Sequence, residues 1–235
     1  MSHVKKCLKL VMEYRLGLLL PKRKQDSELK TAGISAKALA ETPTRFHVTV
    51  LPEKPFLFCV PEVISERRQY VPIGWLRPPV IPSNKLRILK DADLWHFGIL
   101  TSRMHMAWTA FVGGRLESRY QYSVGINYNP FPWPDADDHV RAKIRPLAQG
   151  VLDARAAHPG QTLADLYDPD VMPADLRKAH HALDLAVDRL YRQTPFGSDR
   201  ERVEHLFGLY EKLVAPLAAA AAKPKAKRKA RAAAN

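Results

Sequence analysis

Nine histidines and two cysteines are the residues of this chain best suited to metal or nucleophilic chemistry. A zinc site needs three or four such ligands at short, regular spacing. His96 and His105 stand nine positions apart, and the adjacent His180 and His181 would point to different sides of a helix. No cysteine or carboxylate joins either pair at ligand spacing, so the sequence predicts no metal site.

Cys7 and Cys59 form no metal-binding or disulfide pattern, which is typical of a protein from a reducing compartment. We therefore expect a cytoplasmic location. The basic N-terminus leads into an apolar run, but Glu13 and Arg15 interrupt it, as in an amphipathic helix rather than a signal peptide. Since no run of about 18 uncharged apolar residues occurs, we expect no membrane segment.

Cofactor-dependent chemistry would require a glycine-rich turn between a strand and a helix. The adjacent glycines Gly113 and Gly114 follow a predicted helix instead of opening one, and neither a Gly-x-Ser-x-Gly nor a Walker A pattern occurs. Residues 127–131 are similar to the Asn/Asp-Pro-Pro-aromatic motif of amino-methyltransferases, but the second proline is absent and no cofactor-binding sheet precedes it. We therefore expect no catalytic residue and no bound cofactor in this chain, and interpret the segment as a proline-stiffened hinge.

The net charge of +13 is unevenly distributed along the chain. Residues 1–134 carry 20 basic and 10 acidic residues, whereas residues 135–214 carry 11 basic and 14 acidic residues. Residues 215–235 add six basic residues and no acidic ones. A positive excess that is concentrated in part of a chain indicates a surface for a polyanion, so the charge favours a nucleic-acid partner.

The first half of the chain mixes helical and extended patterns. Helices are expected at residues 3–20 and 26–40, and prolines recur too often over residues 43–82 to allow long helices there. The β-prone runs between these prolines predict short strands at 46–51, 56–60 and 69–76. A helix is then expected over 93–112, ending at the glycine pair, and partial alternation predicts a strand over 115–128.

Beyond the proline-rich run at residues 129–134 the pattern is helical. Pro146 is expected to kink or split the first helix, Pro173 to open the second, and a capping box at residues 198–201 to open the last. Beyond Pro216 the sequence is low in complexity, which predicts disorder. The apolar positions expected to face the core are Val140, Ile144, Leu147, Val151, Leu176, Leu183, Val187, Leu190, Val203, Leu206, Leu209, Tyr210 and Leu213.

These patterns predict an α+β fold in three parts. A mixed domain of short strands and helices covers residues 1–134, a small all-helical domain covers 135–216, and a basic disordered tail covers 217–235. The change in the sign of the charge and the proline run both place the first boundary near residue 134.

Six strings of this sequence, taken in order, resemble one family. Together they are similar to the MmeI-like family of type II restriction–modification enzymes, which are class I S-adenosylmethionine-dependent, adenine-specific DNA methyltransferases. The resemblance extends from about residue 5 to residue 214. The strings are TPTRF at 42–46, SERRQYVPIGWL at 65–76, HFGILTSRMHMAW at 96–108, GRL at 114–116, YNPFPWP at 128–134 and LADLYDP at 163–169.

In that family one polypeptide carries a nuclease, a helical connector, an adenine-N6 methyltransferase, a target-recognition domain and a C-terminal helical domain. This chain resembles only the last two, with the target-recognition domain at 1–134 and the helical domain at 135–216. The resemblance therefore implies a module that recognises a specific double-stranded DNA sequence and lacks the catalytic domain, with S-adenosylmethionine used only by the full-length family.

Three alternatives stay open at this point. The chain could be the specificity subunit of a split enzyme, active only with a separately encoded methyltransferase or nuclease chain. It could be a non-functional truncated remnant. It could also be a general basic RNA-binding protein, which the resemblance disfavours.

The family places its main base-reading side chains in the segment that here reads Arg-Leu-Glu-Ser-Arg-Tyr, residues 115–120. This implies base-reading roles for Glu117 and Arg119, which would share one face of a strand. A carboxylate accepts from cytosine N4, and a guanidinium donates to guanine O6 and N7, so the pair suits a single C·G base pair. The alternative for this pair is a surface salt bridge.

Other basic residues of the first half are better suited to phosphates than to bases, because most protein–DNA hydrogen bonds go to the backbone. Each of them could instead be a solvated surface charge. The residues expected to contact the DNA backbone are Arg67, Arg68, Arg77, Lys85, Arg87, Arg103 and Arg115.

Overall fold

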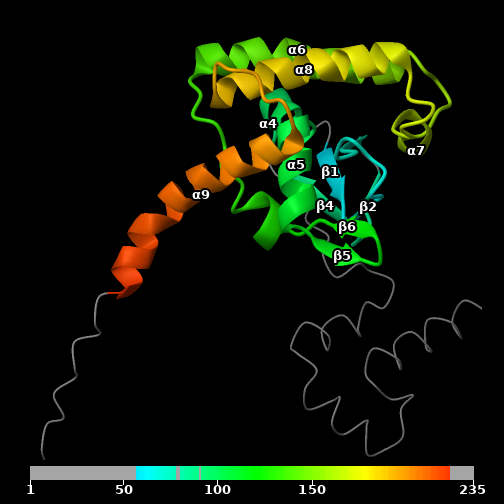
Figure 1. Ribbon diagram of the computed structural model, residues 1–235. Helices are drawn as coiled ribbons and strands as arrows, with labels where there is room; N and C mark the ends of the chain where they lie inside the picture. The colour runs from blue at the N-terminus through cyan, green and yellow to red at the C-terminus, as the bar shows by residue number, and fades with distance from the viewer. Residues whose placement is uncertain (1–56, 78–79, 90, 223–235) are drawn as a thin grey trace, which may run out of the picture. The chain divides into compact units, whose positions relative to one another are not determined.

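The computed structural model describes residues 57–77, 80–89 and 91–222 (Figure 1). The helices expected at 3–20 and 26–40 and the strand expected at 46–51 lie outside the described residues. Helices and strands below carry the labels of Figure 1.

The first small sheet is antiparallel and has β1 (Leu57–Pro61) between β3 (Gly74–Leu76) and β4 (Leu86–Leu89). Four successive β1 side chains are buried, as is typical of a central strand covered on both faces. The strand expected at 56–60 is therefore confirmed to within one residue. Of the strand expected at 69–76 only the last three residues form β3, since Pro72 cannot donate to a ladder.

The second antiparallel sheet joins β2 (Val63–Ile64), β6 (Arg119–Gln121) and β5 (Gly114–Leu116) in that order. The single strand expected over 115–128 is wrong. The segment forms a hairpin followed by η1 (Val124–Tyr128), one turn of π-helix in which the Ser123 hydroxyl accepts from the Ile126 amide. The apolar alternation of the segment misleads because Val124 and Ile126 are exposed.

Two helices, α4 (Leu94–Leu100) and α5 (Arg103–Val112), replace the single helix expected at 93–112. The Asp93 carboxylate accepts from the first amides of α4, and the Ser102 hydroxyl accepts from the His105 amide at the start of α5. Each helix thus has its own N-cap. Because a capping residue has extended backbone, Ser102 interrupts the helical run.

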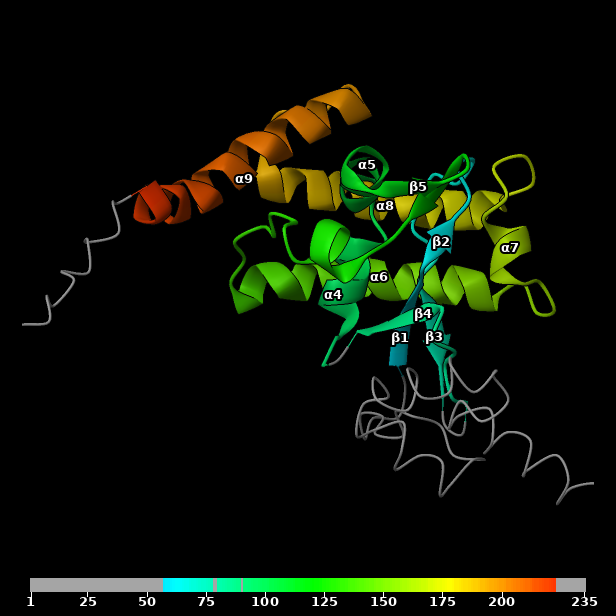
Figure 2. The same ribbon diagram turned by 90° about the horizontal axis from the view of Figure 1, so that it is seen from below.

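The helices α6 (Asp138–Ala156) and α8 (Ala174–Tyr191) lie side by side, with α4 packed against α6 (Figures 1 and 2). Gly98 lies in this crossing and allows α4 and α6 to approach closely. Pro146 was expected to kink or split α6, but the helix is continuous through it. Pro173 stands at the N-cap of α8, one position before the expected one.

The chain continues from α6 through the single turn α7 (Leu163–Leu166) and ends its described part in α9 (Asp199–Ala222). The Ser198 hydroxyl accepts from the Glu201 amide, as expected of a capping residue. α9 runs past Pro216, so the residues at which a disordered tail was expected to begin are helical. Residues 223–235 lie outside the described residues.

The expected buried faces of α6 and α8 are confirmed at Ile144, Val151, Leu176, Leu183 and Val187, all of them at most 1% exposed. On α9, Val203 and Leu206 are buried. Leu213 was expected to face the core but is 60% exposed, so this part of the prediction is wrong. None of the described helices is both long and apolar enough to cross a membrane.

The proline-rich run at 129–134 contacts α5 on the N-terminal side of the sequence and α8 on the C-terminal side. Phe131 is buried, with its ring 4.6 Å from that of His105 between centroids. The Tyr191 hydroxyl of α8 donates to the Pro132 carbonyl over 2.9 Å. The architecture confirms an α+β arrangement with a helical C-terminal region, while the domain boundary expected at this run stays a prediction.

Candidate nucleic-acid interface

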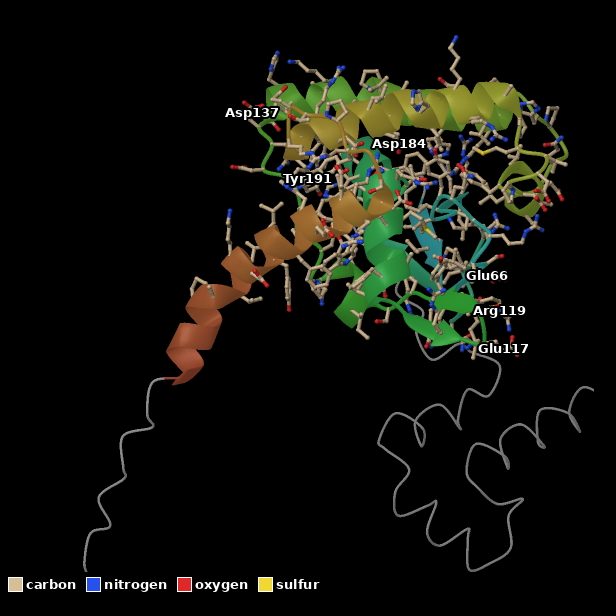
Figure 3. The ribbon with its side chains drawn as sticks, in the orientation of Figure 1. Glu66, Glu117, Arg119, Asp137, Asp184 and Tyr191 are labelled. Atoms are coloured by element: carbon tan, nitrogen blue, oxygen red, sulfur yellow. The ribbon has the colours of Figure 1, made fainter. Side chains whose placement is uncertain are left out.

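The β5–β6 hairpin presents an acidic and a basic side chain at its tip (Figure 3). The Arg119 Nη2 atom lies 2.6 Å from the Glu117 Oε2 atom, and the two side chains are 44% and 76% exposed. The structure therefore brings Glu117 and Arg119, the two side chains expected to read bases, together on the surface. An exposed pair of this kind adds at most about 1 kcal/mol to stability, so its two members are available to other partners.

Glu117 does not lie on a strand, which corrects the expectation that it and Arg119 share a strand face. Leu116 pairs with Arg119, so Glu117 and Ser118 form a two-residue loop. Glu117 has a φ of 58°, which an L-residue adopts at a cost of roughly 1–2 kcal/mol. Glycine is the residue preferred at the first position of such a loop. A glutamate in this conformation is the kind of local strain that concentrates at functional sites.

Arg115 lies on β5 directly opposite Tyr120 of β6, and its guanidinium carbon is 4.0 Å from the centroid of the Tyr120 ring. Its Nη1 atom donates to the Ser118 carbonyl over 3.1 Å, and its Nη2 atom donates to the Ala110 carbonyl over 3.3 Å. This residue, expected to contact phosphate, therefore has three interactions within the chain.

Arg67 and Arg68 turn toward the loop around α7. Arg67 forms ion pairs with Asp168 and Asp170 on the surface. Arg68 donates to the Leu163 carbonyl over 2.9 Å, and burial lowers the pKa of its guanidinium. Arg67 therefore lies on the surface in exchangeable ion pairs, whereas Arg68 is partly withdrawn from it.

Three basic residues lie in or directly beside the strands of the first sheet. Lys85 and Arg87 each approach the Glu62 carboxylate to 3.3 Å. The Arg77 guanidinium carbon lies 5.7 Å from the centroid of the Trp75 ring. The Lys85 and Arg87 side chains are 73% and 37% exposed, although Glu62 itself is only 18% exposed, so the two cations are open to a phosphate oxygen.

Arg103 has a different setting, because it joins α5 to α9. Its Nε and Nη2 atoms donate to the two carboxylate oxygens of Asp199 over 3.0 and 2.8 Å. Its backbone amide donates to Asp184 over 2.7 Å. A bidentate pair of this kind fixes both side chains, so the geometry favours a structural role for Arg103 over the phosphate contact expected from the sequence.

A groove of about 980 Å³ lies between α5 and α9, and the sequence does not predict it. Its lining includes the apolar side chains of Phe111 and Phe207 and the Tyr120 ring of the hairpin. Acidic and basic residues also line it, among them the ion-paired Arg200 and Glu204. Phe111, which is 66% exposed, is an apolar side chain on this surface.

No group of three or more His, Cys, Asp or Glu side chains in the described part of the chain is placed to hold a metal ion. His105 and His180, two of the nine histidines, are instead core residues. His105 contacts the Tyr122 hydroxyl over 3.0 Å and His180 contacts the Tyr167 hydroxyl over 2.7 Å. Burial lowers the pKa of His105 to about 3, so it is neutral in the folded protein.

Comparisons with known proteins give one consistent result. The family model described as "MmeI, target recognition domain" matches residues 7–135, and the model described as "MmeI, C-terminal domain" matches residues 136–218. DNA methyltransferase A of Bacillus subtilis (strain 168) is 41% identical over 184 residues, which are 78% of this chain and 21% of that protein.

A solved structure of the type IIL restriction–modification enzyme MmeI in complex with DNA is similar with a TM-score of 0.78 and 37% sequence identity. The similarity covers 92% of this chain and 27% of that one. The chain thus spans about a fifth to a quarter of the length of these relatives.

Proposed function

The chain belongs to the MmeI family, with that family's target recognition domain followed by its C-terminal domain, and we propose that it recognises a specific sequence in double-stranded DNA. The observation that carries this proposal is the charged pair at the tip of the β5–β6 hairpin. It is exposed, strained at Glu117, and carried by a chain that is similar over 92% of its length to a protein solved with DNA.

The geometry of the pair suits the reading of one C·G base pair. The Glu117 carboxylate would accept from cytosine N4, and the Arg119 guanidinium would donate to guanine O6 and N7. Cytosine and guanine of one base pair lie side by side in the major groove. Side chains that are to contact both must also lie close together, as Glu117 and Arg119 do. Each good bidentate contact discriminates by about 1–3 kcal/mol, which exceeds the exposed ion pair that it replaces.

Phosphate contacts would supply most of the affinity. Lys85, Arg87, Arg77 and Arg67 are the members of the expected set that we propose for this role, because their own side chains are exposed and can reach a phosphate oxygen. We do not propose it for the other three residues expected to contact phosphate, because each donates hydrogen bonds to carbonyl or carboxylate groups of the chain. They are Arg68, Arg103 and Arg115.

A binding selection tests this function. The chain is incubated with a pool of duplexes carrying a randomised central region, and the bound fraction is recovered and sequenced over several rounds. We expect one motif to be enriched, with a C·G pair at one of its positions. A pool that stays random after several rounds, or equal binding to duplex RNA of the enriched sequence, would contradict specific DNA recognition.

We further propose that residues 1–235 do not transfer methyl groups by themselves and that methyl transfer requires a catalytic domain that binds S-adenosylmethionine. Two observations support this: the sequence has no glycine-rich cofactor turn, and the chain matches 21% of a DNA methyltransferase. Transfer of tritium from labelled S-adenosylmethionine to duplex DNA by the pure chain would refute the proposal. Transfer that appears only when a catalytic chain of the family is added would support it.

A further inference from the structure

Arg115 occupies the junction between helix α5 and the loop that carries Glu117. One of its terminal nitrogens donates to Ala110, in the last turn of α5, and the other donates to Ser118, the second residue of the loop. The last four carbonyls of a helix lack partners within the helix, so Ala110 offers an open acceptor. The guanidinium therefore connects the end of the helix to the tip of the hairpin.

The Tyr120 ring supports the same guanidinium from one face. It lies 4.0 Å from the Arg115 guanidinium carbon, within the range of a cation–π interaction, and the two residues are direct cross-strand partners. A planar guanidinium can stack flat on a ring while two of its nitrogens donate to different acceptors, whereas an ammonium group has a single nitrogen and no plane to stack. The contacts of Arg115 therefore depend on the shape of the side chain and not only on its charge.

We infer that Arg115 is a positioning residue for base discrimination: it holds the Glu117–Ser118 loop so that Glu117 and Arg119 face one base pair, and it does not itself bind phosphate. The inference rests on the proposed DNA-recognition function. The positive φ of Glu117 is unfavourable for an L-residue, so the loop needs a contact that fixes it. The Arg115 bond to the adjacent Ser118 carbonyl supplies such a contact.

Two substitutions separate positioning from phosphate binding. Arg115→Lys keeps the charge and loses the two-directional fork, whereas Arg115→Gln loses the charge as well. If Arg115 positions the loop, both variants reduce a roughly tenfold preference at the C·G position to within about twofold. The slope of log affinity against log salt concentration stays at its wild-type value in both, because no phosphate contact is removed.

The same pair of changes at Arg87 is the matched control, since Arg87 is proposed to bind phosphate. Arg87→Gln should lower the salt slope by about one and weaken binding to all sequences alike, and Arg87→Lys should leave the slope unchanged. Neither change should alter the enriched motif. The inference is overturned if the Arg115 variants behave like the Arg87 variants, that is, if the motif stays intact and Arg115→Gln lowers the salt slope.

Changes at Tyr120 test the inference without touching Arg115. Tyr120→Phe keeps the ring beneath the guanidinium and should keep the motif, while Tyr120→Leu removes the ring and should lose the preference at the same position as Arg115→Lys. An unaltered motif with Tyr120→Leu would count against the inference, even if the Arg115 variants did not fold by circular dichroism. A wild-type chain without any motif would instead refute the proposed function.

Discussion

The Tyr70 hydroxyl donates to the Asp184 carboxylate over 2.9 Å, and this bond links the segment before β3 to helix α8. The other carboxylate oxygen of Asp184 accepts from the backbone amide of Arg103 over 2.7 Å. Asp184 is 8% exposed, and its burial raises its pKa from 3.8 to about 6. One oxygen therefore joins α8 to the segment before β3 and the other joins α8 to α5, at a site where burial disfavours the charged form.

The raised pKa of Asp184 predicts a specific dependence of stability on pH. Between about pH 4 and pH 6 the folded chain holds more protons at Asp184 than the unfolded chain does, so this residue lowers the unfolding free energy as pH rises. Its contribution is fully present below the unfolded pKa and is lost as pH rises through the folded pKa. The loss amounts to up to roughly 3 kcal/mol.

Urea unfolding of the wild type and of Asp184→Asn at pH 4, 5, 6 and 7 checks this. The difference in unfolding free energy between the two proteins isolates Asp184 from the other titrating groups. We expect the wild type to lose stability relative to the variant as pH rises. A difference that stays constant over this range would show that Asp184 has an ordinary pKa.

The close approach of α4 and α6 predicts that Gly98→Ala is destabilising. A Cβ atom at Gly98 would lie 2.9 Å from the Ile144 Cγ2 atom and 3.2 Å from the Ala148 Cβ atom. Relief requires the two helices to move apart, which costs about 1–3 kcal/mol and outweighs the better helix propensity of alanine. Thermal unfolding measures the effect.

Gly150 provides the matched control on α6. A Cβ atom there meets nothing within 4 Å, so Gly150→Ala should stabilise the chain by up to about 1 kcal/mol. The two alanine substitutions are thus expected to have opposite signs. Equal stabilisation by both would show that α4 and α6 do not pack as closely as the structure has them.

Much of the fold could be predicted from periodicity and from capping residues. The buried faces of α6 and α8 follow from apolar residues at helical spacing, and β1 follows from an uninterrupted apolar run. The break before α5 was missed, because Ser102 is a capping residue inside a stretch whose apolar pattern is continuous. Local patterns identify elements well but give no sign of where a long helical pattern divides.

The candidate site was identified only in part. The closeness of Glu117 and Arg119 was expected, but the backbone of Glu117 was not, since no glycine or asparagine indicates a turn at that position. The structural partner of Arg103 was also missed, because Asp199 is 96 residues away in the sequence. Contacts of this kind depend on how helices pack and cannot be deduced from sequence spacing.

Binding to duplex DNA should depend strongly on salt. With the four phosphate contacts proposed above, the affinity should fall roughly a hundredfold or more between about 50 and 200 mM salt. Fluorescence anisotropy with a labelled duplex measures this fall. An affinity independent of salt would mean that the basic surface of residues 57–134 does not face the DNA.

Truncation after Ala222 removes six basic residues and leaves α9 intact. These residues can contribute only sequence-independent attraction, so binding to all duplexes should weaken to the same extent. Anisotropy with a selected duplex and with an unrelated duplex compares the two losses. A larger loss for the selected duplex would assign a reading role to the C-terminal segment.

The charge swap Glu117→Lys with Arg119→Asp, compared with wild type in a selection on randomised duplexes, tests the central claim most directly. The introduced lysine would donate to guanine where Glu117 accepts from cytosine, and the introduced aspartate would accept from the cytosine opposite. We expect the preferred pair at one position to change from C·G to G·C by roughly tenfold or more, with each single change doing worse. An unchanged motif would mean that the pair is only a surface salt bridge and would contradict the claim.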